Sequence, residues 1–345
     1  MTTSATVEQT RLCSIEDFLG PGDNRFFARG FQRATHQVYD IVASAADAAE
    51  PGVRATADLS YPADWSTKQD DTDLRPHLAT TDALILGVQL AEIHLTHAYG
   101  LTPAERGASR LRKVVMRAGT QPLEDLDGVV LAAALRSTAE LCDGADEFVS
   151  VFDCSVGPLK VRCEIEHPIN ERAEAEASFD SLDHVLGAGA TRLYGEGFKT
   201  RRHAIQDVDV DMAELVAQAA VHLTSVPDSP ALTEGIEGSV DPSVSMVECF
   251  VVNLQLAQVL MYKMDSVRRE DSDNLWMMQT IIEAPRTPRP IDGPLAARAA
   301  IVKKHLLPLR GGLWRSVDIA GHMSGIDLRC SFAHELPEEA ALKAV

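Results

Sequence analysis

The clearest hydrophobic pattern is a stretch from Thr81 to Tyr99 whose apolar residues cover nearly every side of a helix. Thr81 or Asp82 can cap the first amides, and Gly100 follows the last turn, so a helix is predicted here. At about 1.5 Å per residue it would run roughly 25 to 30 Å. A helix that is apolar all round is buried, and we therefore expect it to be wrapped by other elements.

Alternating apolar and polar residues predict strands on both sides of this helix. Val161, Cys163 and Ile165 fall on one face of the last strand before the chain midpoint, with charged residues on the other. The same phase recurs near the end of the chain, at Ile326, Leu328, Cys330 and Phe332. An antiparallel sheet with one buried face is therefore predicted. The strands expected in the first half are 30–43, 53–61, 112–118, 129–136, 147–154 and 160–166.

One segment of the chain occurs twice, as FLGPGDNRFFARGF (Phe18 to Phe31) and as VLGAGATRLYGEGF (Val185 to Phe198). Over the 23 positions around it eight residues are identical, where composition alone gives about one or two. We interpret it as the opening turn and first strand of a duplicated domain. Its glycine spacing matches neither a P-loop nor a dinucleotide fingerprint. Matches at nearly the same shift recur at Pro76 and Pro242, Gln89 and Gln255, Cys163 and Cys330, and His167 and His334.

The duplication predicts two domains, at 14–168 and 181–336, joined by a polar linker at 169–180. Residues 1–13 and 337–345 are expected to be flexible ends. Two strands, a long helix and three or four further strands follow one another in each domain. This is the order of the hotdog fold, in which an antiparallel sheet curls around a central helix. The expected class is α+β, a double hotdog that forms a pseudo-dimer within one chain.

Composition favours a soluble protein without nucleic-acid or membrane partners. A net charge of -19 opposes binding to nucleic acid and anionic lipid. The first residues lack a secretory pattern, and the longest apolar stretch, Asp82 to Leu95, is too short to cross a bilayer. We therefore expect a cytoplasmic protein. The six cysteines have no metal-binding spacing, and free buried thiols are expected.

The stretches IEDFLGPGDNRFFARGFQR and YPADWSTKQDDTDLRPHLATTDALILGVQLAE resemble the avirulence D family. Its better-known members come from plant-pathogenic bacteria and direct the synthesis of syringolide-type acyl-sugar elicitors, which are secondary metabolites. The resemblance covers both halves and implies an acyltransferase that joins a β-ketoacyl group to a ketose-like hydroxyl. Related double hotdog enzymes of γ-butyrolactone signal synthesis use a triose phosphate acceptor. The implied donor is an acyl-CoA or an acyl carrier protein thioester, and no cofactor is expected.

Acyl transfer from a thioester needs a base for the attacking hydroxyl and amide donors for the oxyanion. His77 lies just before the predicted helix, whose N-terminal amides favour negative charge. We interpret His77 as the general base. Asp82 either orients the imidazole or caps the helix. Arg75 and Thr81 belong to the same segment and are expected to contact substrate.

The second copy lacks the base, because Ser243 stands opposite His77 and Glu248 opposite Asp82. One competent site, carried by the first copy, is therefore expected.

Two residues shared by both copies have two interpretations each. Gln89, which matches Gln255, either contacts the thioester or forms a buried hydrogen bond that ties the helix to the sheet. Arg25, which matches Arg192, either binds substrate or belongs to the duplicated framework.

Glu92, His94 and His97 lie near the end of the predicted helix, where histidines also suit the helix dipole. No metal is expected, because no further ligand accompanies them. Three basic clusters are either solvated faces or receptors for the phosphate of a CoA or carrier-protein arm. They are 110–113, 200–202 and 267–269.

Two alternatives to acyl transfer stay open. The first is hydrolysis or dehydration of a thioester on the same fold, and the second is binding of an acyl ligand without turnover. Dehydration is disfavoured, because hotdog hydratases carry an acid on the central helix, whereas Gly87, Val88 and Gln89 occupy its middle. The acyl chain length, the acceptor and any further dimerisation are not fixed by the sequence.

Overall fold

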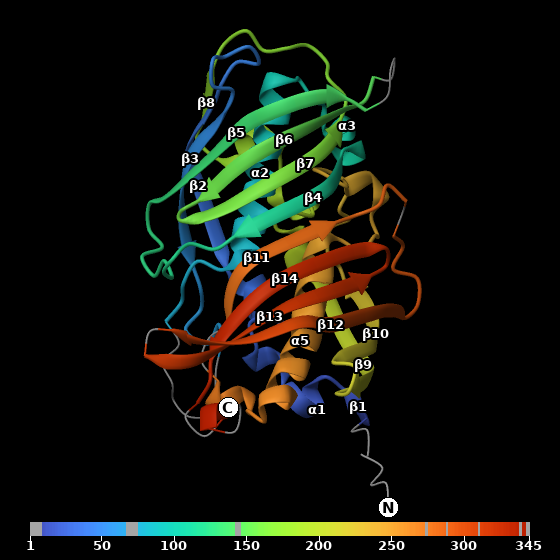
Figure 1. The fold of residues 1–345 in the computed structure, drawn as a ribbon. Helices are drawn as coiled ribbons and strands as arrows, with labels where there is room; N and C mark the ends of the chain where they lie inside the picture. The colour runs from blue at the N-terminus through green and yellow to red at the C-terminus, as the bar shows by residue number, and fades with distance from the viewer. Residues whose placement is uncertain are drawn as a thin grey trace, which may run out of the picture.

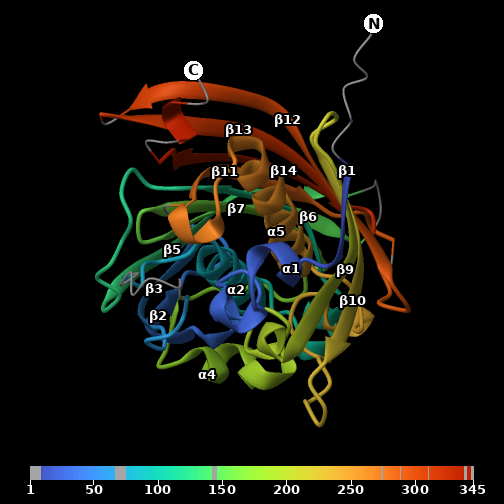
Figure 2. The same ribbon diagram turned by 90° about the horizontal axis from the view of Figure 1, so that it is seen from below.

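Two long helices form the centre of the molecule in the computed structural model, which describes residues 9–66, 75–141, 146–272, 275–287, 289–309, 311–337 and 340–342. They are α2 (Thr80–Ala98) and α5 (Met246–Asp265), and both are buried along most of their length. Figure 2 shows both of them within the curve of the sheet. The short helices are α1 (Glu16–Leu19), α3 (Pro103–Ala108) and α4 (Leu182–Leu186).

The strands of the two halves correspond one to one. In the first half they are β2 (Thr35–Ala43), β3 (Gly52–Ser60), β4 (Arg110–Arg117), β5 (Val129–Glu140), β6 (Phe148–Val156) and β7 (Leu159–His167). In the second half they are β9 (Arg201–Asp211), β10 (Val216–Ser225), β11 (Trp276–Glu283), β12 (Leu295–Leu309), β13 (Gly312–Met323) and β14 (Ile326–Glu335). The two remaining strands are β1 (Gln9–Ser14) and β8 (Ala177–Phe179).

All of these strands belong to one 14-stranded antiparallel sheet (Figure 1). Its order is β1-β9-β10-β12-β13-β14-β11-β4-β7-β6-β5-β3-β2-β8. The order reads nearly the same from both ends, and the halves meet where β4 pairs with β11. The predicted double hotdog of the α+β class is therefore confirmed. The predicted inward faces are also confirmed, since Val161, Cys163 and Ile165 are buried.

The outermost strands are exchanged between the halves. β1 precedes the first half in sequence but pairs with β9 of the second, and β8 precedes the second half but pairs with β2 of the first. The prediction of a flexible end is therefore wrong for residues 9–13. The predicted linker at 169–180 contains β8, so each half lends a strand to the other.

The repeated segment forms helical turns rather than the predicted first strand. In each copy a short helix, α1 or α4, is followed by two 3₁₀ turns, and the strand begins only at Thr35 or Arg201. Gly20 (φ 80°) and Gly187 (φ 81°) end the two short helices in a conformation that favours glycine. These two glycines therefore recur because the chain turns at the end of each short helix, and this agrees with the interpretation of the repeat as part of the fold.

The glutamines of the two central helices join the halves. Gln89 Nε2 donates to the carbonyl of Tyr194 at 2.5 Å, and Gln255 Nε2 donates to the carbonyl of Phe27 at 3.1 Å. A shift of 167 residues pairs Phe27 with Tyr194, so the two hydrogen bonds obey the pseudo-twofold symmetry of the fold. The hydrogen bond of Gln89 is therefore structural, but it runs to the other half rather than to the sheet.

Two buried histidines give the fold a dependence on pH. His94 and His167 lie on either side of Tyr99, with ring centroids 5.6 and 5.5 Å away. Burial lowers the pKa of each to about 4. The unfolded chain therefore binds more protons than the folded chain between about pH 6.5 and 4.

We expect the free energy of unfolding to fall as the pH drops from 6.5 towards 4, by up to about 1.4 kcal/mol per pH unit for each histidine. Above about pH 6.5 both histidines are neutral in the folded and in the unfolded chain, so they no longer change the free energy of unfolding with pH. Urea denaturation of the wild type and of His94→Leu across this range measures it, and the variant should have the shallower slope. Equal slopes would contradict the assignment.

Candidate functional site

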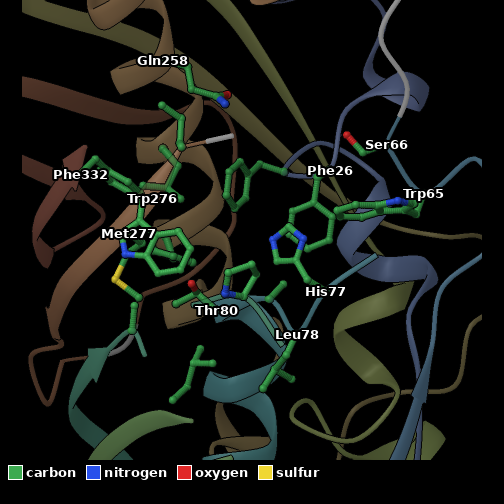
Figure 3. Close-up of a pocket in the computed structure, with 18 of the residues that line it drawn as sticks. Phe26, Trp65, Ser66, His77, Leu78, Thr80, Gln258, Trp276, Met277 and Phe332 are labelled. Carbon is green, nitrogen blue, oxygen red and sulfur yellow. The ribbon is translucent and has the colours of Figure 1, made fainter. Parts of the chain in front are cut away.

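A cavity of about 160 Å³ lies between the two halves, at the N-terminal end of α2 and against the side of α5 (Figure 3). Most of its wall is apolar. The larger apolar residues are Phe26, Phe27, Trp65, Leu78, Leu123, Leu159, Phe250, Leu254, Leu275, Trp276, Met277 and Phe332. The polar residues are Arg25, Ser66, His77, Thr80, Gln121, Gln258, Tyr262 and Arg269. None of the described residues that line it carries a carboxylate.

His77 contributes the imidazole of this cavity from the segment before α2. Its Nδ1 lies 3.2 Å from the carbonyl oxygen of Arg75, and this acceptor assigns the proton of the neutral ring to Nδ1. Nε2 then holds the lone pair. The ring packs edge-on against Trp65, with centroids 5.6 Å apart, and Figure 3 shows it beside Phe26. The imidazole is thus oriented, with one nitrogen able to accept a proton.

Asp82 caps α2 and does not orient His77. Its carboxylate accepts from the N–H of Ala79 at 3.0 Å, from His36 Nε2 at 2.9 Å, and from the hydroxyl of Tyr61. Burial and this carboxylate raise the pKa of Tyr61 well above its ordinary value. Of the two interpretations of Asp82, the structure therefore supports the cap.

The matching cap in the second half supports this assignment. Glu248 accepts there from the N–H of Ser245 at 2.8 Å, at the start of α5. The chain thus fixes both central helices with a carboxylate at the same helical position.

Three other predicted substrate residues lie outside the cavity. The Arg75 side chain is 76% exposed and faces Glu124, so only its backbone carbonyl reaches the site. Thr81 is buried and does not line the cavity, which its neighbour Thr80 does. Gln89 faces Tyr194 of the other half. Chain proximity to His77 suggested Arg75 and Thr81, and the match with Gln255 suggested Gln89, but none of the three side chains lines the cavity.

Arg25 does line the cavity, as predicted, although it is only 4% exposed. Its Nη1 donates to Gln255 Oε1 at 2.7 Å, so the guanidinium bridges to the other half. Burial, together with the charges of Arg269 and Arg29, lowers its pKa to about 10. Arg25 therefore belongs to the duplicated framework and also faces the cavity, and its contact with a substrate stays a prediction.

A network of buried ion pairs, with residues from both halves, occupies the region that the pseudo-twofold symmetry relates to the cavity. Glu92 lies 3.3 Å from Arg106 Nε and 3.9 Å from Arg192 Nη1. Beside it, Glu237 accepts from Arg289 at 2.6 Å and from the hydroxyl of Tyr194 at 3.2 Å. This network fills the space with side chains.

The three residues of the suspected metal set do not converge. Glu92 belongs to the ion-pair network, His94 packs against Tyr99 and Phe152, and His97 Nε2 contacts the carbonyl of Ala175. Within the described residues no three His, Cys, Asp or Glu side chains form a metal-binding group.

Of the three basic clusters, only 267–269 reaches the cavity, through Arg269. Arg112 and Lys113 pair with Glu166 and Glu283 on the sheet, and Arg201 pairs with Asp241. The first two clusters therefore balance acidic residues locally.

Several lining residues were not predicted, among them Trp65, Tyr262 and Trp276. They come from a loop and from the other half, which no local pattern connects to His77. Gln258 carried a usable signal, since a shift of 166 residues pairs it with Glu92. Comparing the two copies position by position would have drawn attention to that exchange of Glu for Gln.

The curved sheet, the two central helices and the duplicated strand order define a double hotdog protein. More specifically, the chain belongs to the family described as Pseudomonas avirulence D protein (AvrD), whose model matches residues 10–337. This confirms the resemblance seen in the sequence. Among curated proteins there is no match. No described helix is long and apolar enough to cross a membrane.

Solved structures share the fold at low sequence identity. A conserved hypothetical protein from Mycobacterium tuberculosis, described as a double hotdog, is 12% identical with a TM-score of 0.42, covering 76% of this chain and 82% of that one. The tesB protein of Mycobacterium avium subspecies paratuberculosis is 9% identical, with a TM-score of 0.37 and coverages of 82% and 93%. A trans-AT polyketide synthase dehydratase domain from Brevibacillus brevis is 12% identical, with a TM-score of 0.36 and coverages of 86% and 97%.

Proposed function

We propose that this protein transfers a β-ketoacyl group from a thioester of CoA or acyl carrier protein to the hydroxyl of a sugar-like acceptor. The observation that carries the proposal is the oriented imidazole of His77 in an apolar cavity at the N-terminus of a buried helix. The β-ketoacyl group and the ketose or triose phosphate acceptor come from the family resemblance.

In the proposed reaction, Nε2 of His77 accepts the proton of the acceptor hydroxyl as its oxygen attacks the thioester carbonyl. The first-turn amides of α2 have no acceptor one turn earlier, and with the helix dipole they stabilise the oxyanion. Collapse of the tetrahedral intermediate breaks the C–S bond, and the proton on Nε2 passes to the departing thiolate. The products are an ester and a free thiol.

The lining of the cavity favours a reaction that needs one base over dehydration, which in hotdog enzymes pairs the histidine with an acid. The polar residues that α5 contributes to the cavity are Gln258 and Tyr262, and none of the described lining residues is acidic. The proposed single site also agrees with the second half, where Ser243 replaces the histidine and ion pairs fill the space.

The test is to incubate the purified protein with a β-ketoacyl thioester, with and without a ketose or triose phosphate, while following free thiol and product mass together. Acceptor-dependent thiol release with an adduct of the summed mass is the expected result. Thiol release without acceptor would replace the proposal by hydrolysis. Saturable binding with no release would replace it by a sequestering function.

A further inference from the structure

Arg25 is a buried cation without the buried counter-charge that its counterpart has. Among the described residues, the one carboxylate within 4.0 Å is Glu16, at 3.9 Å, and that side chain is 55% exposed. The Nε of Arg25 has no hydrogen-bond partner among them. Because a buried charge is stable only when it is paired, this arrangement is incomplete.

At the symmetry-related site the arginine has a buried carboxylate beside it, although its Nε also has no hydrogen-bond partner among the described residues. Arg192, the counterpart of Arg25, lies 3.9 Å from Glu92, and both side chains are 1% exposed. The counterpart of Glu92 on α5 is Gln258, which lines the cavity together with Arg25. Gln258 therefore leaves the cavity without the negative charge that Glu92 provides at the symmetry-related site.

A second guanidinium reinforces the positive charge of this region. Arg269 lines the cavity and donates through Nη2 to the carbonyl of Asn24 at 3.0 Å. It contributes to the lowered pKa of Arg25, as expected for two like charges close together. This concentration of positive charge occurs in a chain of net charge -19.

We propose that Arg25 and Arg269 bind an anionic group of a substrate, a phosphate or a carboxylate, which supplies the negative charge that Glu92 gives to Arg192. Guanidinium groups bind these planar or tetrahedral oxyanions through paired hydrogen bonds. The inference rests on the proposed function, since it assigns an anionic moiety to a substrate of that same site.

Binding can be measured without turnover, because Trp65 and Trp276 line the cavity and report occupancy by fluorescence. The probes are glycerol 3-phosphate, glycerate, inorganic phosphate and glycerol. We expect at least one anionic probe to bind at least about tenfold more tightly than glycerol, with the preference decreasing as salt is added. No preference over glycerol would overturn the proposal. Comparing the Kd of glycerol 3-phosphate with that of glycerate then shows whether the site prefers a phosphate or a carboxylate.

The sharpest variant is Gln258→Glu, which gives Arg25 the partner that Arg192 already has. The fold should tolerate it, because the second half contains the same pair. Its Kd for the preferred anion should rise about tenfold or more, whereas the neutral control Gln258→Leu should keep the wild-type preference for anions over glycerol. Arg25→Gln and Arg269→Gln should act in the same direction as Gln258→Glu. An unchanged Kd in Gln258→Glu would overturn the proposal.

Kinetic measurements then show whether the acyl donor or the acceptor carries the anionic group. A KM that rises in Gln258→Glu for a CoA thioester, but not for the N-acetylcysteamine thioester of the same acyl group, assigns it to the donor. A KM that rises for a phosphorylated acceptor with both donors assigns it to the acceptor. Because the titration uses no thioester, its failure is distinguishable from a failure of acyl transfer.

Discussion

Replacing His77 with alanine is expected to lower kcat/KM for acyl transfer by about 10²- to 10⁴-fold, the range for loss of a general base. His77 is the one imidazole among the described residues that line the cavity, and no carboxylate there can replace it. Its Nδ1 is held by the carbonyl of Arg75, so the wild-type ring presents Nε2 without prior reorientation. Stopped assays of thiol release and adduct mass measure the effect.

The fold should survive this substitution, because the His77 side chain is partly exposed and makes one hydrogen bond. Circular dichroism and the denaturation midpoint of His77→Ala should therefore remain close to wild type. His322→Ala is the matched control, since that histidine lies on β13 with its side chain 54% exposed and pairs with Asp327. A folded His77→Ala protein with activity within twofold of His322→Ala would refute the assignment.

Local sequence patterns predicted the helices and strands whose formation depends on the order of apolar and polar residues within one segment. The buried faces of β7 and β14 follow from strict alternation, and α2 follows from a long apolar run that ends at Gly100. The duplicated segment was assigned to a strand because glycines and aromatics suit turns and cores equally. The exchange of β1 and β8 depends on pairing between halves that no local pattern contains.

The same limit applies to the site. Distance along the chain correctly placed His77 before a helix N-terminus. It did not predict which side of that helix would face the cavity, and Thr81, which was grouped with His77 for its closeness in sequence, does not line it. Gln258 comes from the opposite helix, about half the chain away. Only the duplication connects Gln258 with the segment around His77. It pairs Gln258, which lines the cavity, with Glu92, which lies in the buried ion-pair network.

The filled site predicts the largest effect on stability. Glu92→Gln is nearly isosteric but leaves Arg106 and Arg192 buried without the carboxylate between them. Among the described residues, the one carboxylate then left within 4.0 Å of Arg192 is Asp183, at 3.9 Å and 70% exposed. Breaking a buried pair by removing one partner destabilises a protein by about 3 to 5 kcal/mol, because the remaining charge keeps its desolvation penalty. Urea denaturation at neutral pH measures this difference.

Glu283→Gln is the matched control for this substitution. Glu283 lies 2.8 Å from Lys113 with both side chains partly exposed, and removing such a pair changes stability by about 0 to 1 kcal/mol. The contrast between the two variants isolates the effect of burial from that of charge pairing itself. If Glu92→Gln were no more destabilising than Glu283→Gln, the guanidiniums of Arg106 and Arg192 would need no buried partner. Arg25 would then need no anionic ligand to complete its charge balance, because a buried guanidinium in this fold would be stable without a buried counter-charge.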